Sequence, residues 1–421
     1  MDKNQLTKLE KYWILYDIGN SAFVLLVSTI IPIYFKNIAS ANGISLSDST
    51  AYYGYAVSLS TLIVAVIGPV LGTIADTKGY KKPLFTFSMM VGVIGCAALA
   101  LPSSWIFFLA VFVVAKVGFA SSLIFYDAML SDVTTDDRMD NLSSLGYAWG
   151  YLGSCVPFIA SLILVLFAEP IGLSTAAATA IAFLLNAVWW LVVTLPLLKN
   201  YKQIYYIEPV RSPIKSSFQR FGNIFKELRE NKTVFYFLLA FFFYIDGVYT
   251  IIEMATSYGK DVGIDDNSLL LALLLTQIVA FPFSILFGKL TKKYRTTDLI
   301  SISIVGYIGI AAFALQLDKT WEFWFLAVLV AVFQGAIQAL SRSHFARIIP
   351  KNKSSEYFGI YDIFGKGASF LGTMLMGITT QLADNSKVGV AVIGGMLVLG
   401  FMIFHFKCRN CLLYTSDAAD E

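Results

Sequence analysis

Ionisable side chains inside long apolar segments are the residues of this sequence that could do chemistry. A charge placed in lipid costs at least about 2.5–3.5 kcal/mol, so such a side chain is expected to face a partner or a water-filled cavity. There it could bind a charged solute or exchange a proton. The residues are Lys116, Asp246 and Lys366 near the middle of their segments, and Asp17 and Asp127 nearer an end.

A polar stripe follows one face of a later apolar segment. Gln334, Gln338 and Arg342 are four residues apart, so in a helix they lie one above another. A guanidinium binds carboxylate or phosphate through two parallel hydrogen bonds, which suits Arg342 to an anionic solute. Alternatively, Arg342 marks the inner end of its helix and extends to the lipid headgroups. The two glutamines are expected to face a cavity.

Each mid-segment charge also has a structural alternative. Lys116 could pair with an acid on a neighbouring helix. Asp362 and Lys366 are four residues apart and could pair with each other. Asp17 could bind a proton, or it could order an inner gate. These alternatives predict charges that contact one another rather than a solute.

The sequence carries no pattern typical of an enzyme. It contains no nucleotide-binding loop, no HExxH zinc motif, no nucleophile elbow and no run of metal ligands. The two histidines, His344 and His405, lie far apart near predicted helix ends. We therefore expect no catalytic activity, no cofactor, no metal site and no nucleic-acid partner.

The elements that position these residues must be membrane helices. The chain of 421 residues is 57% hydrophobic and only 14% charged, which is more apolar than a soluble protein requires. Twelve segments are long enough to span a bilayer. They lie near 12–36, 51–76, 83–101, 104–130, 143–168, 174–198, 233–258, 267–291, 297–316, 321–347, 355–382 and 388–406.

The distribution of basic residues predicts the orientation. With both termini in the cytoplasm, nearly all of the 31 Lys and Arg residues lie on the inner side. The exceptions are Lys36, Lys260, Lys319 and Lys387 in outer loops, and Lys116 and Lys366 within helices. This asymmetry favours cytoplasmic termini.

The longest interruption divides the chain into two sets of six segments. Residues 199–232 carry eight Lys or Arg against three Glu and are expected to form a basic cytoplasmic loop. We predict a six-helix bundle over 1–198, a second over 233–407, and a non-native or disordered tail over 408–421. The predicted fold is therefore all-α, with twelve transmembrane helices in two pseudo-symmetric bundles around a cavity.

A short basic turn joins the second and third predicted helices. Its order is Gly-x-x-x-Asp-x-x-Gly-x-Lys-Lys, formed by Gly72, Asp76, Lys78, Gly79, Lys81 and Lys82. This order resembles the loop at the same place in the major facilitator superfamily of transporters. The resemblance implies a conformational latch, in which the acid and the basic residues pair with neighbouring helix ends and stabilise the outward-facing state.

Further runs resemble one branch of that superfamily, the vacuole-effluxer-like (autophagy-related) permeases. They are Tyr16-Asp17 to Asn20-Ser21-Ala22-Phe23, Phe125-Tyr126-Asp127-Ala128, Asp246-Gly247, Gln334-Gly335 to Ser341-Arg342-Ser343, and Phe358-Gly359 to Gly365-Lys366. The resemblance implies export of small solutes, and in fungi of amino acids from the vacuole. Asp127 stands where the branch usually has Asn, which adds a negative charge and could alter proton coupling or substrate preference.

We therefore expect a secondary transporter that exports or exchanges an amino acid or related zwitterion by alternating access, with possible coupling to protons. Lys116 and Asp246 would contact the solute or the proton, and Arg342 would lie near the inner mouth. Two alternatives stay open: a flippase for lysophospholipid or another amphiphile, and a non-transporting receptor. We expect a monomer in the bilayer, in the bacterial cytoplasmic membrane, or in the vacuolar membrane if the source is eukaryotic.

Overall fold

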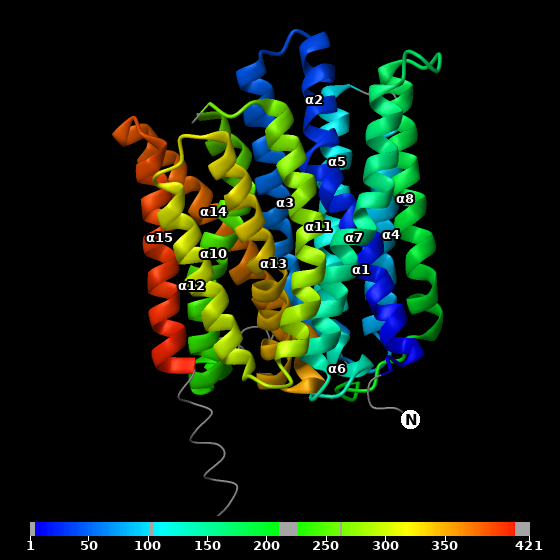
Figure 1. Ribbon diagram of the computed structural model, residues 1–421. Coiled ribbons are helices and arrows are strands. Elements are labelled where there is room, and N and C mark those ends of the chain that lie inside the picture. The colour runs from blue at the N-terminus through cyan, green and yellow to red at the C-terminus, as the bar shows by residue number, and fades with distance from the viewer. Residues whose placement is uncertain (1–4, 102–103, 210–225, 262, 409–421) are drawn as a thin grey trace, which may run out of the picture.

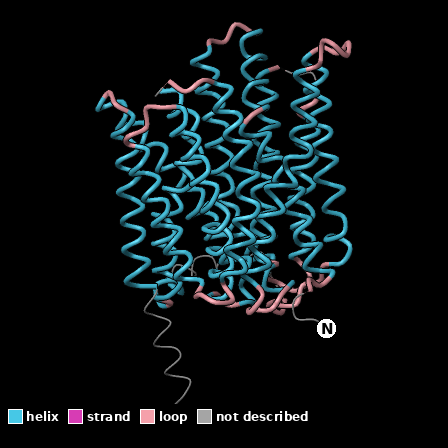
Figure 2. Tube along the Cα trace, in the orientation of Figure 1, coloured by secondary structure: helices cyan, strands magenta, loops and turns pink. Residues whose placement is uncertain are grey.

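The computed structural model describes residues 5–101, 104–209, 226–261 and 263–408, and these are almost entirely helical (Figures 1 and 2). The helices of the first half of the sequence are α1 (Lys8–Ser28), α2 (Ile30–Ala41), α3 (Leu46–Ala75), α4 (Lys81–Ala98), α5 (Trp105–Ala128), α6 (Leu130–Val133), α7 (Met139–Leu166) and α8 (Thr175–Asn200). Those of the second half are α10 (Lys232–Asp261), α11 (Asp266–Leu290), α12 (Thr296–Ala314), α13 (Thr320–Ile348), α14 (Ser354–Ala383) and α15 (Ser386–Ile403), followed by a π-helical turn, Phe404–Cys408.

Ten candidate membrane spans are present among the described residues, with α1 and α2 forming one of them. The helices α4 and α14 occupy the two remaining predicted segments and are not among the ten. Two lysines begin α4, and α14 carries Glu356, Asp362 and Lys366. The structure thus confirms a multi-pass helical protein, whereas twelve spans and the predicted orientation remain predictions. The tail prediction falls on 409–421, outside the described residues.

The first predicted span is interrupted at Thr29, a break that the apolar pattern did not reveal. The backbone of Thr29 lies at φ −133° and ψ −77°, outside the helical region. Pro32 has no N–H group to donate to the preceding turn, which explains why the helix restarts here. The Tyr53 hydroxyl of α3 donates a hydrogen bond of 2.7 Å to the Val27 carbonyl, so the break is tied to a neighbouring helix.

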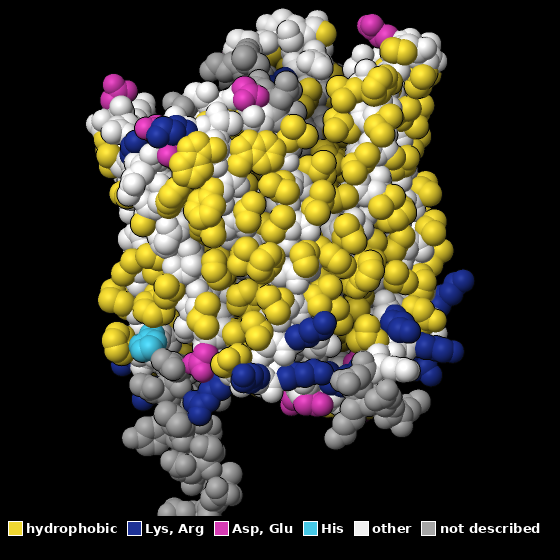
Figure 3. Space-filling view, viewed as in Figure 1, with side chains coloured by type: hydrophobic (Ala, Val, Ile, Leu, Met, Phe, Trp, Pro, Cys, Tyr) yellow, Lys and Arg dark blue, Asp and Glu magenta, His cyan; other side chains and the backbone are white. Residues whose placement is uncertain are grey.

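Lysine and arginine side chains gather at one end of the helical bundle, below a broad hydrophobic belt (Figure 3). The chain's N-terminus and the end of α15 lie at this end (Figure 1). We call it the basic end and define it by the start of α1, the turn 76–80 between α3 and α4, and the start of α14.

Helices from the two halves of the sequence pack closely, α3 against α14 and α7 against α11. Two glycines allow the first approach near the basic end. A Cβ at Gly72 would overlap the Ser355 carbonyl of α14, and a Cβ at Gly359 would lie 2.8 Å from the Pro69 Cα of α3. Larger side chains would separate these backbones, so the contact depends on both glycines.

Candidate functional site

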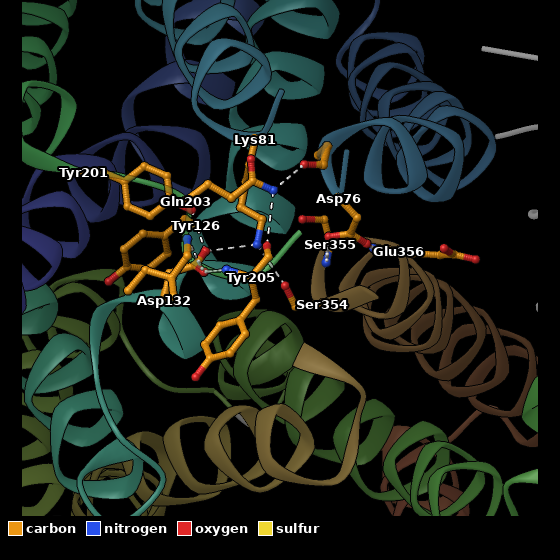
Figure 4. A network of polar contacts seen from close by, with 12 residues as sticks. Asp76, Lys81, Tyr126, Asp132, Tyr201, Gln203, Tyr205, Ser354, Ser355 and Glu356 are labelled. Atoms are coloured by element: carbon orange, nitrogen blue, oxygen red, sulfur yellow. Dashed lines mark hydrogen bonds and ion pairs between the residues drawn. The ribbon is translucent and has the colours of Figure 1, made fainter. Parts of the chain in front are cut away.

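Asp76 of the first half caps the first turn of α14 in the second half (Figure 4). Its Oδ1 accepts a hydrogen bond from the Ser355 N–H and its Oδ2 accepts one from the Glu356 N–H, both 2.9 Å long. These are two of the helix's unpaired N-terminal donors, and the partial positive charge of the helix end favours a carboxylate. Burial raises the pKa of Asp76 to about 6, against the lowering effect of Lys81 and the two N–H groups. At neutral pH the cap is therefore a charged one.

Lys81 makes a second contact between the halves, beside the first. Its Nζ lies 3.1 Å from Asp132 Oδ2 and donates a 2.9 Å hydrogen bond to the Ser354 hydroxyl, the first residue of α14. The side chains of Lys81 and Asp132 are both fully buried. A buried ion pair is stable only when its remaining polar atoms are also satisfied, and here they are.

Asp132 also fixes the start of the central loop, which we call the strap and define as residues 201–208. Asp132 Oδ1 accepts hydrogen bonds from the Ile204 and Tyr205 N–H groups at 3.0 and 2.9 Å. Its Oδ2 accepts a 2.6 Å hydrogen bond from the Tyr201 hydroxyl. Sequence analysis did not identify Asp132, because an acid in a loop gives no sign that it is buried.

The remaining predicted latch residues contact the strap rather than α14. Lys78 Nζ lies 3.3 Å from Glu208, and both side chains are exposed. Gly79, at φ +82°, donates its N–H to the Gln203 side chain at 3.0 Å. The Lys82 side chain forms no hydrogen bond or ion pair within the described part of the chain, so its predicted latch role has no geometric support. Gly72, Asp76 and Lys81 are the latch residues that bridge the halves.

Arg342 of α13 brings together two carboxylates from the first half. Its Nη1 donates to Asp127 Oδ1 of α5 at 3.0 Å, and its Nη2 lies 3.4 Å from Asp17 Oδ2 of α1. The Nε and Nη2 atoms also donate to the hydroxyl and the carbonyl of Ser143, at 2.9 and 3.1 Å. Three aromatic rings surround the guanidinium at 4.4–5.6 Å, those of Trp13, Tyr126 and Tyr147. Neither sequence interpretation of Arg342, a solute site or a headgroup contact, included this interaction.

Further contacts join the halves around this cluster. Asp140 at the start of α7 forms an ion pair with Arg347 of α13 and accepts a 2.6 Å hydrogen bond from the Thr296 hydroxyl of α12. Asp136 and Lys351 form a partly exposed pair at 2.7 Å. The charged contacts between the halves are thus concentrated at the basic end in the described residues.

Lys116 lies between the halves without such a partner. The structure shows no hydrogen bond or ion pair for its ammonium among the described residues, and the side chain is only half buried. The charged groups that interact with the Lys116 ammonium over a longer distance are Glu253 of α10 and Lys366 of α14, both in the other half. Sequence analysis missed Glu253, which lies two turns beyond Asp246 near the outer part of α10. For Lys366, the structural alternative holds: its Nζ lies 2.5 Å from Asp362 Oδ1.

Asp246 is fully buried inside the second half. Its Oδ1 accepts hydrogen bonds from the Gly372 N–H of α14 at 3.0 Å and from the Thr250 hydroxyl at 3.4 Å. Its Oδ2 has no hydrogen-bond partner. Asp246 therefore lies apart from the cluster that Arg342 forms with Asp17 and Asp127.

The three residues of the polar stripe on α13 also lie in different surroundings. Gln334 lines a cavity of about 120 Å³ within the second half, together with Thr250, Thr276 and Gln277. Gln338 is half-buried and does not line that cavity. Arg342 belongs to the contacts between the halves. No group of three or more metal ligands occurs among the described residues.

Comparison with known proteins identifies the family to which the chain belongs. The profile of the family described as "Vacuole effluxer Atg22 like" matches residues 7–139 and 131–408. An uncharacterised MFS-type transporter of Bacillus subtilis, YxiO, is 44% identical over 96% of this chain and 95% of its own length. Autophagy-related protein 22 of Saccharomyces cerevisiae is 24% identical over 96% of this chain and 91% of its own length.

Solved structures show the same fold. The human organic anion transporter MFSD10 superposes with a TM-score of 0.69 at 14% identity, covering 94% of this chain and 99% of its own. The proton:xylose symporter XylE gives a TM-score of 0.66 at 13% identity, covering 95% and 94%. These relatives and neighbours are transporters, which confirms the prediction that the chain is not an enzyme.

Proposed function

Since the chain belongs to the Atg22-like vacuole effluxer family within the major facilitator superfamily, we propose that it moves a small zwitterion, such as an amino acid, across its membrane by alternating access. In this proposal the halves of the sequence form two six-helix bundles, and the basic end faces the cytoplasm. The protein works as a monomer and exports or exchanges its solute, with a proton as the coupling ion. The membrane is the bacterial cytoplasmic membrane, or the vacuolar membrane in a eukaryote.

The observation that carries the proposal is Lys116. An ammonium between two bundles that forms no ion pair with any described residue is a cation that can bind a carboxylate. Glu253 acts on it from the opposite bundle and offers a negative group for the solute's ammonium. One cation and one anion from different bundles would hold the two ends of a zwitterion, so solute binding would also draw the bundles together.

The receptor alternative is less well supported. It predicts that the mid-membrane charges pair only with one another. Lys366 and Asp362 do so, but Lys116 does not. A flippase would need a headgroup cation near lipid. Arg342 does not provide one here, because its guanidinium is enclosed by Asp17, Asp127 and Ser143.

The described state corresponds to one step of the cycle. Asp76, Lys81, Arg342 and Asp140 tie the halves together at the basic end. With that end closed, the solute would reach Lys116 from the opposite side. Reversal of the transporter would then require these contacts to break together.

Counterflow into proteoliposomes tests the proposal. Vesicles loaded with an unlabelled amino acid mixture should accumulate a labelled amino acid from outside, and a sugar should not be accumulated. Lys116→Gln should reduce this exchange, whereas Asp318→Asn, in an exposed loop, should leave it unchanged. Failure of every amino acid to exchange, with correctly folded protein, would overturn the proposal.

A further inference from the structure

Asp246 is a buried carboxyl group outside both proposed sites. It belongs neither to the contacts between the halves at the basic end, which we call the gate, nor to the proposed zwitterion site of Lys116 and Glu253. It is fully buried, and its Oδ2 has no hydrogen-bond partner. No Lys, Arg or His nitrogen pairs with it among the described residues. An isolated carboxylate in such a place is costly, and the group avoids the cost by keeping its proton. In this respect it differs from Asp17 and Asp127, which both form an ion pair with Arg342.

The surroundings of Asp246 supply hydrogen-bond donors for one oxygen only. The Gly372 N–H and the Thr250 hydroxyl both donate to Oδ1. A Cβ at position 372 would overlap Oδ1, so α14 can approach the carboxyl only because a glycine stands there. This arrangement suits a neutral acid whose Oδ1 is the carbonyl oxygen and whose Oδ2 carries the proton.

The charged groups around Asp246 do not change that conclusion. On its own helix, the nearest acid toward the opposite end is Glu253, two turns further along. The neighbouring helices present uncharged groups: α14 the Gly372 N–H, and α15 Leu397 against Gly247. From α13, the nearby Ser341 hydroxyl pairs with Tyr244.

A cavity begins beside Thr250, next to this carboxyl group, and extends toward the end opposite the basic end. Thr250, which contacts Asp246, lines it together with Gln334 and Met376, and its walls continue to Tyr258 and Phe323. The lining is mostly apolar, but Thr250, Thr276, Gln277 and Gln334 supply polar groups that could hold water. Water held there would connect the carboxyl group to that compartment while the basic end is closed.

We propose that Asp246 is the site of the coupling proton. Its Oδ2 takes a proton from water in the cavity when the basic end is closed, and the O–H bond breaks again, returning the proton to water, when the halves reverse. This inference rests on the proposed transport function. It adds the residue, its state in this conformation and the side from which it is loaded.

Infrared spectroscopy of the protein in liposomes tests the protonated state without a transported solute. A protonated carboxyl absorbs as a carbonyl, apart from the carboxylate bands, and shifts in deuterium oxide. We expect such a band at neutral pH in the wild type, its loss in Asp246→Asn, and its retention in Asp127→Asn. Asp246→Glu keeps a carboxyl group and should shift the frequency of the band. This variant serves as the test if Asp246→Asn does not fold. A band that persists unchanged in both Asp246 variants would overturn the proposal.

Transport then separates this inference from the proposed function. In Asp246→Asn we expect accumulation driven by a pH gradient to fall much further than amino acid counterflow, because exchange needs no net proton movement. Accumulation driven by an imposed pH gradient should be lost. Retention of pH-driven accumulation would refute the proton site, whereas absence of counterflow in the wild type would refute the proposed function itself.

Discussion

The basic end and the middle of the molecule use their charged residues in opposite ways. At the basic end, Asp76 and Arg342 each contact the other half through several hydrogen bonds, and Lys81 does so through one. In the middle, within the described ranges, Lys116 has no ion pair and one oxygen of Asp246 has no hydrogen-bond partner. Charges that satisfy one another hold a conformation in place. Charges left without partners are available for a solute or a proton.

The comparison also explains why the gate contacts can be reversible. Each one joins a side chain of one half to a backbone group, a hydroxyl or an opposite charge of the other, so separation of the halves would expose both groups to water. Water then replaces the lost hydrogen bonds, which keeps the net cost of each small. A gate built from apolar packing alone would lack this compensation.

The largest expected effect comes from Arg342→Ala. The variant leaves Asp17 and Asp127 buried without their cation, which costs about 3–5 kcal/mol while the basic end stays closed. The open form should become the major one, seen as a longer spin-label distance across the basic end. Arg342→Lys keeps a charge and should give an intermediate result. An unchanged distance in the alanine variant would show that the cluster does not hold the gate.

Gly72→Ala should have the next largest effect. The new Cβ would overlap the Ser355 carbonyl and separate α3 from α14, at a cost of about 1–3 kcal/mol. Gly54→Ala is the matched control, since it lies in the same helix with nothing within 4 Å. The two variants should differ in the spin-label distance across the basic end. Equal spin-label distances in the two variants would mean that the close approach of α3 and α14 does not control closure of the basic end.

Removal of the Asp76 cap should have a smaller effect. Asp76→Ala leaves the Ser355 and Glu356 N–H groups without their acceptor, and the loss of a helix cap costs about 0.5–2 kcal/mol. The ratio of closed to open forms should fall by about tenfold, because 1.4 kcal/mol corresponds to a factor of ten in an equilibrium constant. Thiol labelling at Ser355→Cys, with and without the Asp76 change, measures it. Labelling that does not increase would count against the cap.

Lys116→Gln should alter solute binding with little effect on the gate. The loss of one charge-assisted hydrogen bond to a carboxylate should raise the KM for counterflow by roughly tenfold or more. The distance across the basic end should stay as in the wild type, because Lys116 makes no contact there. A changed distance with an unchanged KM would reverse the roles assigned to the two regions.

Much of the fold could be predicted from the sequence, because membrane spans depend on long apolar runs and on the placement of basic residues. The break at Thr29 could not, since Thr29 and Pro32 sit in an apolar run that is otherwise continuous. Within the latch, the glycine and acid spacing identified Gly72 and Asp76. The strap and Asp132 escaped prediction, because their contacts join residues far apart in the chain.

The candidate site was predicted as one set of residues, but the structure divides it. Asp17, Asp127 and Arg342 lie together at the basic end, and Lys366 pairs with Asp362. Burial and spacing along a helix indicate that a charge needs a partner, but they do not show which partner it finds. That choice depends on how the two halves pack, which single-helix patterns do not contain.

The most direct test of the account is a reversible cross-link across the basic end during transport. Asp136 and Lys351 form a partly exposed pair that contributes little to stability, so both can be replaced by cysteine in a background without the native cysteines. Joining them with a reducible bifunctional thiol reagent should abolish amino acid counterflow, and reduction should restore it. Counterflow that continues at full rate with the cross-link in place would contradict alternating access through this gate.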